Sequence, residues 1–358
     1  MKRNTSFFAA FVLVFGSLGV LYGLYQFADF WMKAPGTQDQ AVFYDVKKNM
    51  TPGQIISDLS SLGVITNPRF FYWVGRFTGK LNKFKAGDYR FTTSMKPTEV
   101  YGILVSGISY GIPLTVPEGH NINQIAGYLD KIRPGDGSEF LKLCTSAKFI
   151  ESLGPWEKTP TTLEGFLFPE TYLVTRRSPV SELIKQMVKR HRAAFTTEYK
   201  ERAAEIGFTE YQVVTLASVV EKETGAPQER PMVASVFHNR LKKKMKLQSD
   251  PTVIYGIKNY AGNITKKDLL TFHPYNTYVI PALPIGPIGN PGSEAIKAVL
   301  YPAESPYLYF VSHNDGTHEF TETYEAHSRA VQKFQIDRKA REGRSWRELS
   351  NKLVPQKN

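Results

Sequence analysis

An uncharged, apolar segment at the N-terminus constrains the architecture of this chain more than any other feature. It runs from Ser6 to Phe27 and follows Lys2 and Arg3. A helix of roughly 20 apolar residues spans the hydrocarbon core of a bilayer. The segment is longer than the apolar part of a usual signal peptide, and it ends without a small-residue cleavage site. We therefore expect a retained membrane anchor rather than a cleaved leader.

The charges on either side of this segment predict its orientation. Lys2 and Arg3 precede it, whereas Asp29 and a single lysine, Lys33, follow it closely. Because positive charge concentrates on the cytoplasmic side of membrane helices, residues 1–33 should comprise a cytoplasmic N-terminus and one transmembrane helix of the inner membrane. The rest of the chain is then expected in the periplasm. That location argues against nucleic acid as a partner.

Composition bounds what the remaining chain can do. The 358 residues are 42% hydrophobic, enough for about two domains with accessory segments. The formal net charge of +12 suits nucleic acid, an anionic membrane surface or an acidic polymer such as peptidoglycan, and charge alone does not choose among them. The only cysteine, Cys144, excludes an intramolecular disulfide and a cysteine zinc site. Its apolar neighbours indicate a small core residue.

The first folded region is predicted to be a compact α+β module over 41–117, preceded by a small, polar linker over 34–40. Its expected elements are a strand over 41–46, helices beginning after Thr51 and Asn67, a strand over 86–91 and a third helix after Pro97. The order strand, helix, helix, strand resembles a LysM-like glycan-binding module. A spacer domain without binding function is the alternative.

The second half is predicted to be mainly helical, with some strand or β-hairpin elements. Residues 118–204 read as a helical connecting region, which ends in a long amphipathic helix over 181–204. A further domain is expected over 205–342, followed by a polar tail over 343–358. The fold class is therefore α+β, with an N-terminal transmembrane helix, a LysM-like module and a mainly helical domain.

The segment from Thr209 to Gly225 carries two candidate acid residues. It reads as a helix with Thr209 as its N-cap and Gly225 as its C-cap. At 100° per residue, Glu221 and Glu223 fall on opposite edges of the apolar face. Half-burial there should raise the pKa of both carboxyl groups, which is the property a general acid needs. Helical geometry does not choose between them.

Polar and aromatic side chains after this helix suit a sugar-binding cleft. A second helix is expected from Arg230, then a turn at Asp250 and Pro251, then a proline- and glycine-rich loop over 280–292 that we interpret mainly as scaffold. The lysines over 242–246 are interpreted as a solvated helix end, with attraction of an anionic polymer as the alternative. The candidates for substrate binding are Asn239, Gln248, Asp250, Tyr255, Asn276 and Tyr278.

Several motifs together resemble one known family. They occupy residues 164–172, 220–224, 247–256, 275–278, 284–292 and 305–320. In sequence and order they are similar to the YceG-like, or MltG, endolytic murein transglycosylases, over nearly the whole chain beyond the expected anchor. In that family the first glutamate of the Glu-Lys-Glu-Thr motif is catalytic, which implies Glu221 here. His273 and Ile285 depart from the family pattern, where serine and proline are common.

The resemblance implies an enzyme that needs no cofactor and no metal. One glutamate would protonate the oxygen that leaves the MurNAc–GlcNAc β-1,4 bond, then help the muramyl C6 hydroxyl attack C1. The product would be a 1,6-anhydro-muramyl end within nascent peptidoglycan strands. A role beside peptidoglycan synthases, as a terminator of glycan elongation, follows from the same resemblance.

Three other functional classes remain as alternatives. A muramidase-type hydrolase needs a second carboxylate, and the available partners are Glu223, which points away from Glu221, and Asp250, which suits a turn. A metal hydrolase is disfavoured because no His-Glu-x-x-His motif occurs, and His313 and His318 fall in an expected strand-turn-strand. A non-catalytic glycan-binding envelope scaffold would fit the module and the anchor. The intact motif around Glu221 favours the enzyme.

Overall fold

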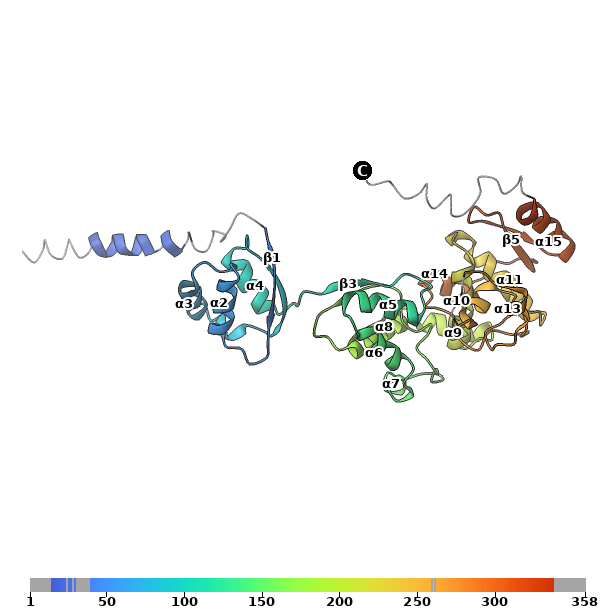
Figure 1. Ribbon diagram of the computed structural model, residues 1–358, viewed down its shortest axis with the longest axis horizontal. Coiled ribbons are helices and arrows are strands. Elements are labelled where there is room, and N and C mark those ends of the chain that lie inside the picture. Colours follow the sequence, from blue (N-terminus) through green and yellow to red (C-terminus); the bar gives the residue numbers. More distant parts are fainter. Residues whose placement is uncertain are drawn as a thin grey trace, which may run out of the picture. The chain divides into compact units, whose positions relative to one another are not determined.

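The computed structural model describes residues 14–23, 25–27, 29, 39–258, 260 and 262–337 (Figure 1). The expected anchor therefore lies partly outside the described residues, as do most of the expected linker and the polar tail. Within it, residues 14–23 and 25–27 are helical and exposed. Among the described residues, no helix has both the length and the apolar character needed to cross a bilayer.

The chain forms two compact units. The first unit comprises residues 1–112 together with 173–178, and the second comprises 113–172 together with 179–358. Two short strands, β3 (Ile112–Thr115) and β4 (Thr171–Val174), pair with each other in a small sheet. Their ranges include the positions where the chain passes from the first unit to the second and later returns.

The first unit consists of a two-stranded antiparallel sheet and three helices. Its elements are β1 (Ala41–Val46), α2 (Pro52–Ser61), α3 (Pro68–Phe77), a 3-10 turn (Leu81–Lys83), β2 (Gly87–Thr92) and α4 (Pro97–Ser106). The strands pair with Ala41 opposite Thr92 and Val46 opposite Gly87. The predicted order of strand, helix, helix, strand is confirmed.

Local sequence signals explain the helices of this unit. Thr51 caps α2, since its hydroxyl accepts a bond from the Gln54 amide at 3.3 Å while the Gln54 side chain accepts from the Thr51 amide at 2.9 Å. The apolar side chains of the helices and the inner sheet face form one core, which includes Leu59, Phe71 and Leu104. This core is what holds the two strands in place.

The first part of the second unit is helical. Its helices are α5 (Ile122–Ile132), α6 (Asp136–Cys144), α7 (Ala147–Ser152), α8 (Val180–Ala194) and α9 (Thr197–Glu205). The prediction of one helix over 181–204 is wrong. Phe195 leaves the helix, and the hydroxyl of Thr196 accepts a bond from the Tyr199 amide at 3.3 Å to begin α9. Cys144 is fully buried at the end of α6, as predicted.

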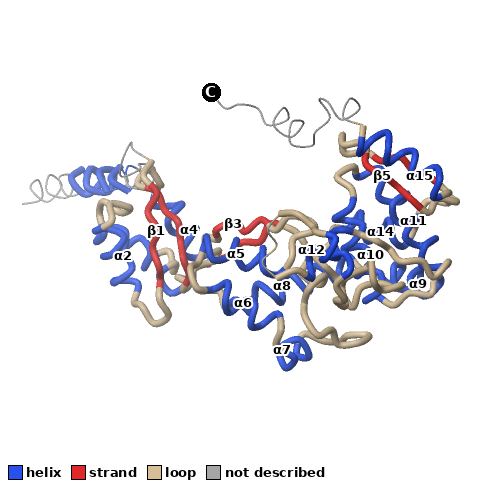
Figure 2. Tube along the Cα trace, turned by 45° about the vertical axis from the view of Figure 1, so that its right-hand side comes forward, coloured by secondary structure: helices blue, strands red, loops and turns tan. Residues whose placement is uncertain are grey.

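The remainder of this unit is arranged around one helix (Figure 2), and most residues of that helix are buried. The elements are α10 (Glu210–Glu223), a 3-10 turn (Pro227–Glu229), α11 (Arg230–Lys242), α12 (Asp250–Gly256), α13 (Lys266–Leu270), α14 (Ser293–Leu300), β5 (Tyr309–Ser312), β6 (His318–Thr321), α15 (Tyr324–Val331) and a π-helical turn (Gln332–Ile336). Helix α10 packs against α11 and α14 through Val213, Leu216 and Val220, which are fully buried. Strands β5 and β6 form the predicted hairpin.

Two local predictions in this region need correction. Thr209 caps α10 as predicted, but the helix ends at Glu223, where Thr224 turns to an extended conformation, so Gly225 is not its C-cap. The expected turn at Asp250 is the first turn of α12, because Pro251 fits the first position of a helix as well as it fits a turn. With small antiparallel sheets among many helices, the α+β class is confirmed.

Candidate active site

The carboxylate of Glu221 lies where the end of α10 meets the beginnings of α11 and α14. One oxygen accepts a bond from Arg230 Nη2 at 2.6 Å, and the other accepts from the Gly292 amide at 3.0 Å. Arg230 is the first residue of α11, and Gly292 immediately precedes α14. The positive ends of two helix dipoles therefore face this carboxylate. Its side chain is only 5% exposed.

Burial and hydrogen bonding act in opposite directions on Glu221. Burial raises its pKa above the usual value, because removal from water disfavours the charged form. The Gly292 amide and Arg230 lower the pKa, and the nearby charge of Glu118 raises it. The net direction is upward. The group thus keeps its proton to a higher pH than an exposed glutamate, yet donors are in place to stabilise its anion.

Glu221 opens onto a cleft of about 630 Å³, within the range of small-molecule sites. Glu118 lies in the same cleft, is about half exposed, and approaches Arg230 Nη2 at 3.4 Å. The hairpin of β5 and β6 supplies another wall. The lining residues are Glu118, Glu221, Lys222, Glu223, Thr224, Gly225, Phe310, Val311, Ser312, Asn314, Gly316 and His318.

Glu223 lies on the other side of the helix and has different partners. The hydroxyl of Ser249 donates to its carboxylate, and burial raises its pKa to about 7. It lines a second hollow, of about 360 Å³, together with Gln248, Asp250 and Tyr278. The Tyr278 hydroxyl donates to Asp250 Oδ1 at 2.6 Å. Because Glu223 and Phe310 line both hollows, these three predicted substrate-binding residues lie beside the Glu221 cleft.

Two other predicted substrate-binding residues are engaged in the framework. Asn239 donates its amide to the main-chain carbonyls of Ser305 and Tyr307, at 2.8 and 3.0 Å. Asn276, which is 2% exposed, donates to three carbonyls within residues 268–271. Neither lines the cleft or the second hollow. These contacts give both amides a structural role in the framework.

A third buried glutamate, Glu164, was missed by the sequence reasoning. It contacts Asn290, two residues before the Gly292 amide that contacts Glu221. Glu164 is 1% exposed and accepts bonds from the Ile122 amide at 3.2 Å, the Tyr255 hydroxyl at 2.9 Å and the Asn290 side chain at 3.0 Å. Burial raises its pKa to about 7. The predicted substrate-binding residue Tyr255 therefore has its hydroxyl committed to Glu164. The sequence signal for Glu164 was an acidic residue beside Gly165 within a run of apolar residues.

The proline- and glycine-rich loop over 280–292 contacts both Glu164 and Glu221. Asn290 is fully buried, and its side chain accepts a bond from the Leu167 amide at 2.9 Å and donates to the His120 carbonyl at 2.8 Å. The Gly119 amide donates to the Asn290 carbonyl at 2.7 Å. The loop is thus the scaffold that we expected. It also provides the Gly292 amide that contacts Glu221.

Comparison with known proteins identifies the family. The model of the YceG-like family matches residues 44–333. This chain belongs to the YceG-like family. The resemblance seen in the sequence motifs is therefore confirmed, and it extends over the first unit as well as the second.

Two relatives of this YceG-like chain carry the name endolytic murein transglycosylase. The protein of Bacillus subtilis is 32% identical over 308 residues, which cover 81% of this chain and 84% of the relative. That of Streptococcus pneumoniae is 26% identical over 347 residues, which cover 88% of this chain and 62% of the relative. A crystal structure of a YceG-like protein from Listeria monocytogenes is 30% identical, covers 81% of this chain and 98% of that one, and superposes with a TM-score of 0.56.

Arg230, which lies between the motifs at 220–224 and 247–256, is a further site residue that sequence reasoning passed over. An arginine at the first position of a helix is unfavourable for the helix dipole unless an acid lies beside it. Here Glu221 and Glu118 are both within 4 Å of its guanidinium nitrogen. That unfavourable position was the signal that a carboxylate would be close.

Proposed function

We propose that this chain is a peptidoglycan lytic transglycosylase that cuts within glycan strands, at the MurNAc–GlcNAc β-1,4 bond. The observation that carries the proposal is the environment of Glu221, a buried carboxyl at the wall of a cleft with two donors on its oxygens. The names of the curated relatives agree with this activity. The catalytic role of Glu221 is part of the proposal.

In the first step, Glu221 acts as a general acid. Its raised pKa favours the protonated form, so it can donate its proton to the glycosidic oxygen as the bond between C1 and that oxygen breaks. The carboxylate that remains accepts bonds from Arg230 and the Gly292 amide. These donors stabilise the negative charge that develops, and they are held in place by two helices before the reaction begins.

In the second step, the same group acts as a base. The carboxylate accepts the proton of the muramyl C6 hydroxyl while that oxygen bonds to C1. The ring closes to a 1,6-anhydro end, Glu221 regains its proton, and no water is consumed. A single carboxyl that must release and recover a proton needs a pKa set between opposing influences. Burial on one side and Arg230 with Gly292 on the other provide that balance.

Hydrolysis is the second candidate, because Glu118 lies in the same cleft as Glu221. It is a more plausible second carboxylate than Glu223 or Asp250, since it shares the Arg230 guanidinium with Glu221. In a hydrolase Glu118 would activate water or attack C1 itself. Under the transglycosylase proposal it only tunes the charge around Glu221.

The proposal includes the location of the enzyme. An anchor over 6–27, with the N-terminus in the cytoplasm, would place both folded units in the periplasm. A linker over 34–40 spans at most about 25 Å even when fully extended. The first unit, acting as a LysM-like module, would hold newly made glycan near the membrane. Cleavage there, beside the synthases, would end strand elongation.

The time course of fragment length tests the mode of cleavage. Purified peptidoglycan strands treated with the chain should shorten to intermediate lengths at the earliest times. Glu118→Gln should keep most of this activity under the transglycosylase mechanism, and Glu221→Gln is the inactive control. Release of disaccharides alone from the start would contradict endolytic action, and loss of activity in Glu118→Gln equal to that in Glu221→Gln would favour hydrolysis.

A further inference from the structure

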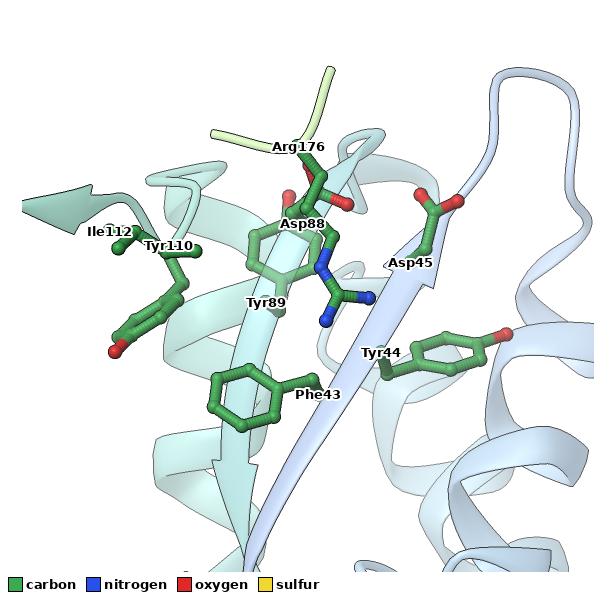
Figure 3. Close-up of a pocket in the computed structure, with 8 residues that line it drawn as sticks. All are labelled: Phe43, Tyr44, Asp45, Asp88, Tyr89, Tyr110, Ile112 and Arg176. Carbon is green, nitrogen blue, oxygen red and sulfur yellow. The ribbon is translucent and has the colours of Figure 1, made fainter. Parts of the chain in front are cut away.

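A separate pocket lies within the first unit, on the outer face of its two-stranded sheet (Figure 3). It has a volume of about 230 Å³, which is small for a saccharide chain but sufficient for an amino-acid-sized group. The residues that define its chemistry are Phe43, Asp45, Asp88, Tyr110 and Arg176. None of them belongs to the cleft of Glu221.

The strand register places two carboxylates directly opposite each other. Asp45 on β1 pairs with Asp88 on β2, so both side chains leave the same face of the sheet. Like charges at directly opposite positions destabilise a sheet. Arg177 offsets part of this repulsion, because it donates to Asp45 Oδ2. It does so for only one of the two acids.

One oxygen of each acid is buried without a hydrogen-bond donor. Among the described residues, nothing donates to Asp45 Oδ1 or to Asp88 Oδ2. Asp88 is 9% exposed, so water has little access to it. A buried carboxylate oxygen without a donor carries a free-energy cost that folding alone does not explain. Two such acceptors in one pocket are typical of a site that binds a ligand through hydrogen-bond donors of the ligand.

The other pocket residues supply an apolar surface and one positive charge. The rings of Phe43 and Tyr110 lie 5.3 Å apart, and Phe43 is 52% exposed. Figure 3 shows the Arg176 guanidinium over the strands, among Phe43, Asp45 and Asp88. The pocket therefore combines two acceptors, one cationic donor and aromatic walls within the space of a single amino acid.

We propose that this pocket binds a zwitterionic amino-acid end, with its ammonium group between Asp45 and Asp88 and its carboxylate on Arg176. The ammonium supplies charge-assisted hydrogen bonds to both free oxygens, and the aliphatic chain packs against Phe43 and Tyr110. If the proposed function holds, the natural source is the free end of a diamino acid in a peptidoglycan stem peptide. The first unit would then recognise the peptide part of the substrate.

Two other ligand classes fit the pocket less well. A hard divalent cation usually takes six or more oxygen ligands, whereas this pocket offers two carboxylates beside an arginine. A neutral sugar could stack on the aromatic rings. It would, however, supply no positive charge to the buried Asp88 carboxylate, and a buried charge needs such compensation.

Calorimetric titration of the full-length chain in detergent tests the proposal. The probes are meso-diaminopimelate, which has two zwitterionic ends, cadaverine, which has only the ammonium groups, and pimelate, which has only the carboxylates. Diaminopimelate should bind saturably, cadaverine about tenfold more weakly, and pimelate not measurably. A chitin tetramer is the sugar probe, and it should not compete.

Two variants separate a binding role from a structural one. Asp88→Asn should weaken diaminopimelate binding at least about tenfold without lowering the melting temperature, because it removes the cross-strand repulsion. Arg176→Gln should weaken diaminopimelate about tenfold but leave cadaverine unchanged. Asp39→Asn makes the same charge change just before the other end of β1, outside the pocket, and should bind as the wild type does.

The inference is overturned if the chitin tetramer binds in place of diaminopimelate, or if all variants bind diaminopimelate equally. It is also overturned if Asp88→Asn melts at a lower temperature while Arg176→Gln binds normally, since Asp88 would then be structural. None of these readouts requires glycan cleavage. Failure of the proposed enzyme activity would therefore leave this test intact, and the reverse also holds.

Discussion

Glu221 and Glu223 lie two positions apart on α10, yet their surroundings differ in kind. Glu221 meets Arg230 and a main-chain amide at the wall of a cleft, whereas Glu223 accepts a bond from a serine hydroxyl in the adjacent hollow. Both have a raised pKa. A raised pKa by itself therefore does not identify the catalytic acid, and we propose Glu221 because its carboxyl lies at the cleft with Arg230 and the Gly292 amide as donors.

Paired substitutions test this assignment. Glu221→Gln keeps the shape of the side chain but removes its proton, so the cleavage rate should fall about a hundredfold to ten-thousandfold. Glu223→Gln should lose less than about tenfold, because its proton is not used in the reaction. Initial rates on purified peptidoglycan, with melting temperatures as the check on folding, give the comparison. Equal losses would mean that the two acids act as one unit.

The buried glutamates also predict how stability depends on pH. The pKa values of Glu164 and Glu223 rise from the usual value of 4.5 to about 7. The folded state therefore binds these protons more tightly than the unfolded state, and the resulting stability is present below pH 4.5 and lost as pH approaches 7. The melting temperature should fall across this window. Glu223→Gln should show a shallower fall, and parallel curves would contradict it.

At the scale of elements, the loop over 284–292 links the framework to the chemistry. Gly289 approaches the Gly119 carbonyl so closely that a Cβ would overlap it, and three residues later the Gly292 amide contacts Glu221. A shift of the loop away from Gly119 must therefore also move the donor on Glu221.

Alanine substitutions of two glycines test this link. Gly289→Ala should lower stability by about 1–3 kcal/mol through overpacking against the main chain. Activity should fall with it, because the Gly292 amide is displaced. The control is Gly127→Ala in the exposed face of α5, where a Cβ meets nothing within 4 Å. It should raise stability by about 0.5–1 kcal/mol. Full activity in Gly289→Ala would separate the loop from catalysis.

The elements that were predictable from sequence are those with local causes. The starts of α2 and α10 follow from Thr51 and Thr209, whose capping partners lie three residues away. The break at Phe195 was missed because apolar positions continue through it at nearly helical spacing. The contact of Glu164 with Asn290 joins positions 126 residues apart, and no local pattern encodes such a pair.

For the whole molecule, the proposed anchor makes a direct prediction about solubility. Because charge is absent from 6 to 27, removal of residues 1–33 should give a folded protein that stays in solution without detergent. The truncated chain should still digest isolated peptidoglycan, since every residue proposed for catalysis lies in the second unit. Sedimentation and a digestion assay measure both. Intact cells that release a processed form would instead indicate a cleaved leader.

We propose that one carboxyl, that of Glu221, cleaves the glycan without consuming water. Digestion in water enriched in heavy oxygen, followed by mass spectrometry of the new muramyl ends, measures this directly. The transglycosylase mechanism predicts ends that are one water lighter than reducing ends and carry no heavy oxygen, formed by the wild type and not by Glu221→Gln. Reducing muramyl ends that contain heavy oxygen would contradict it and establish hydrolysis.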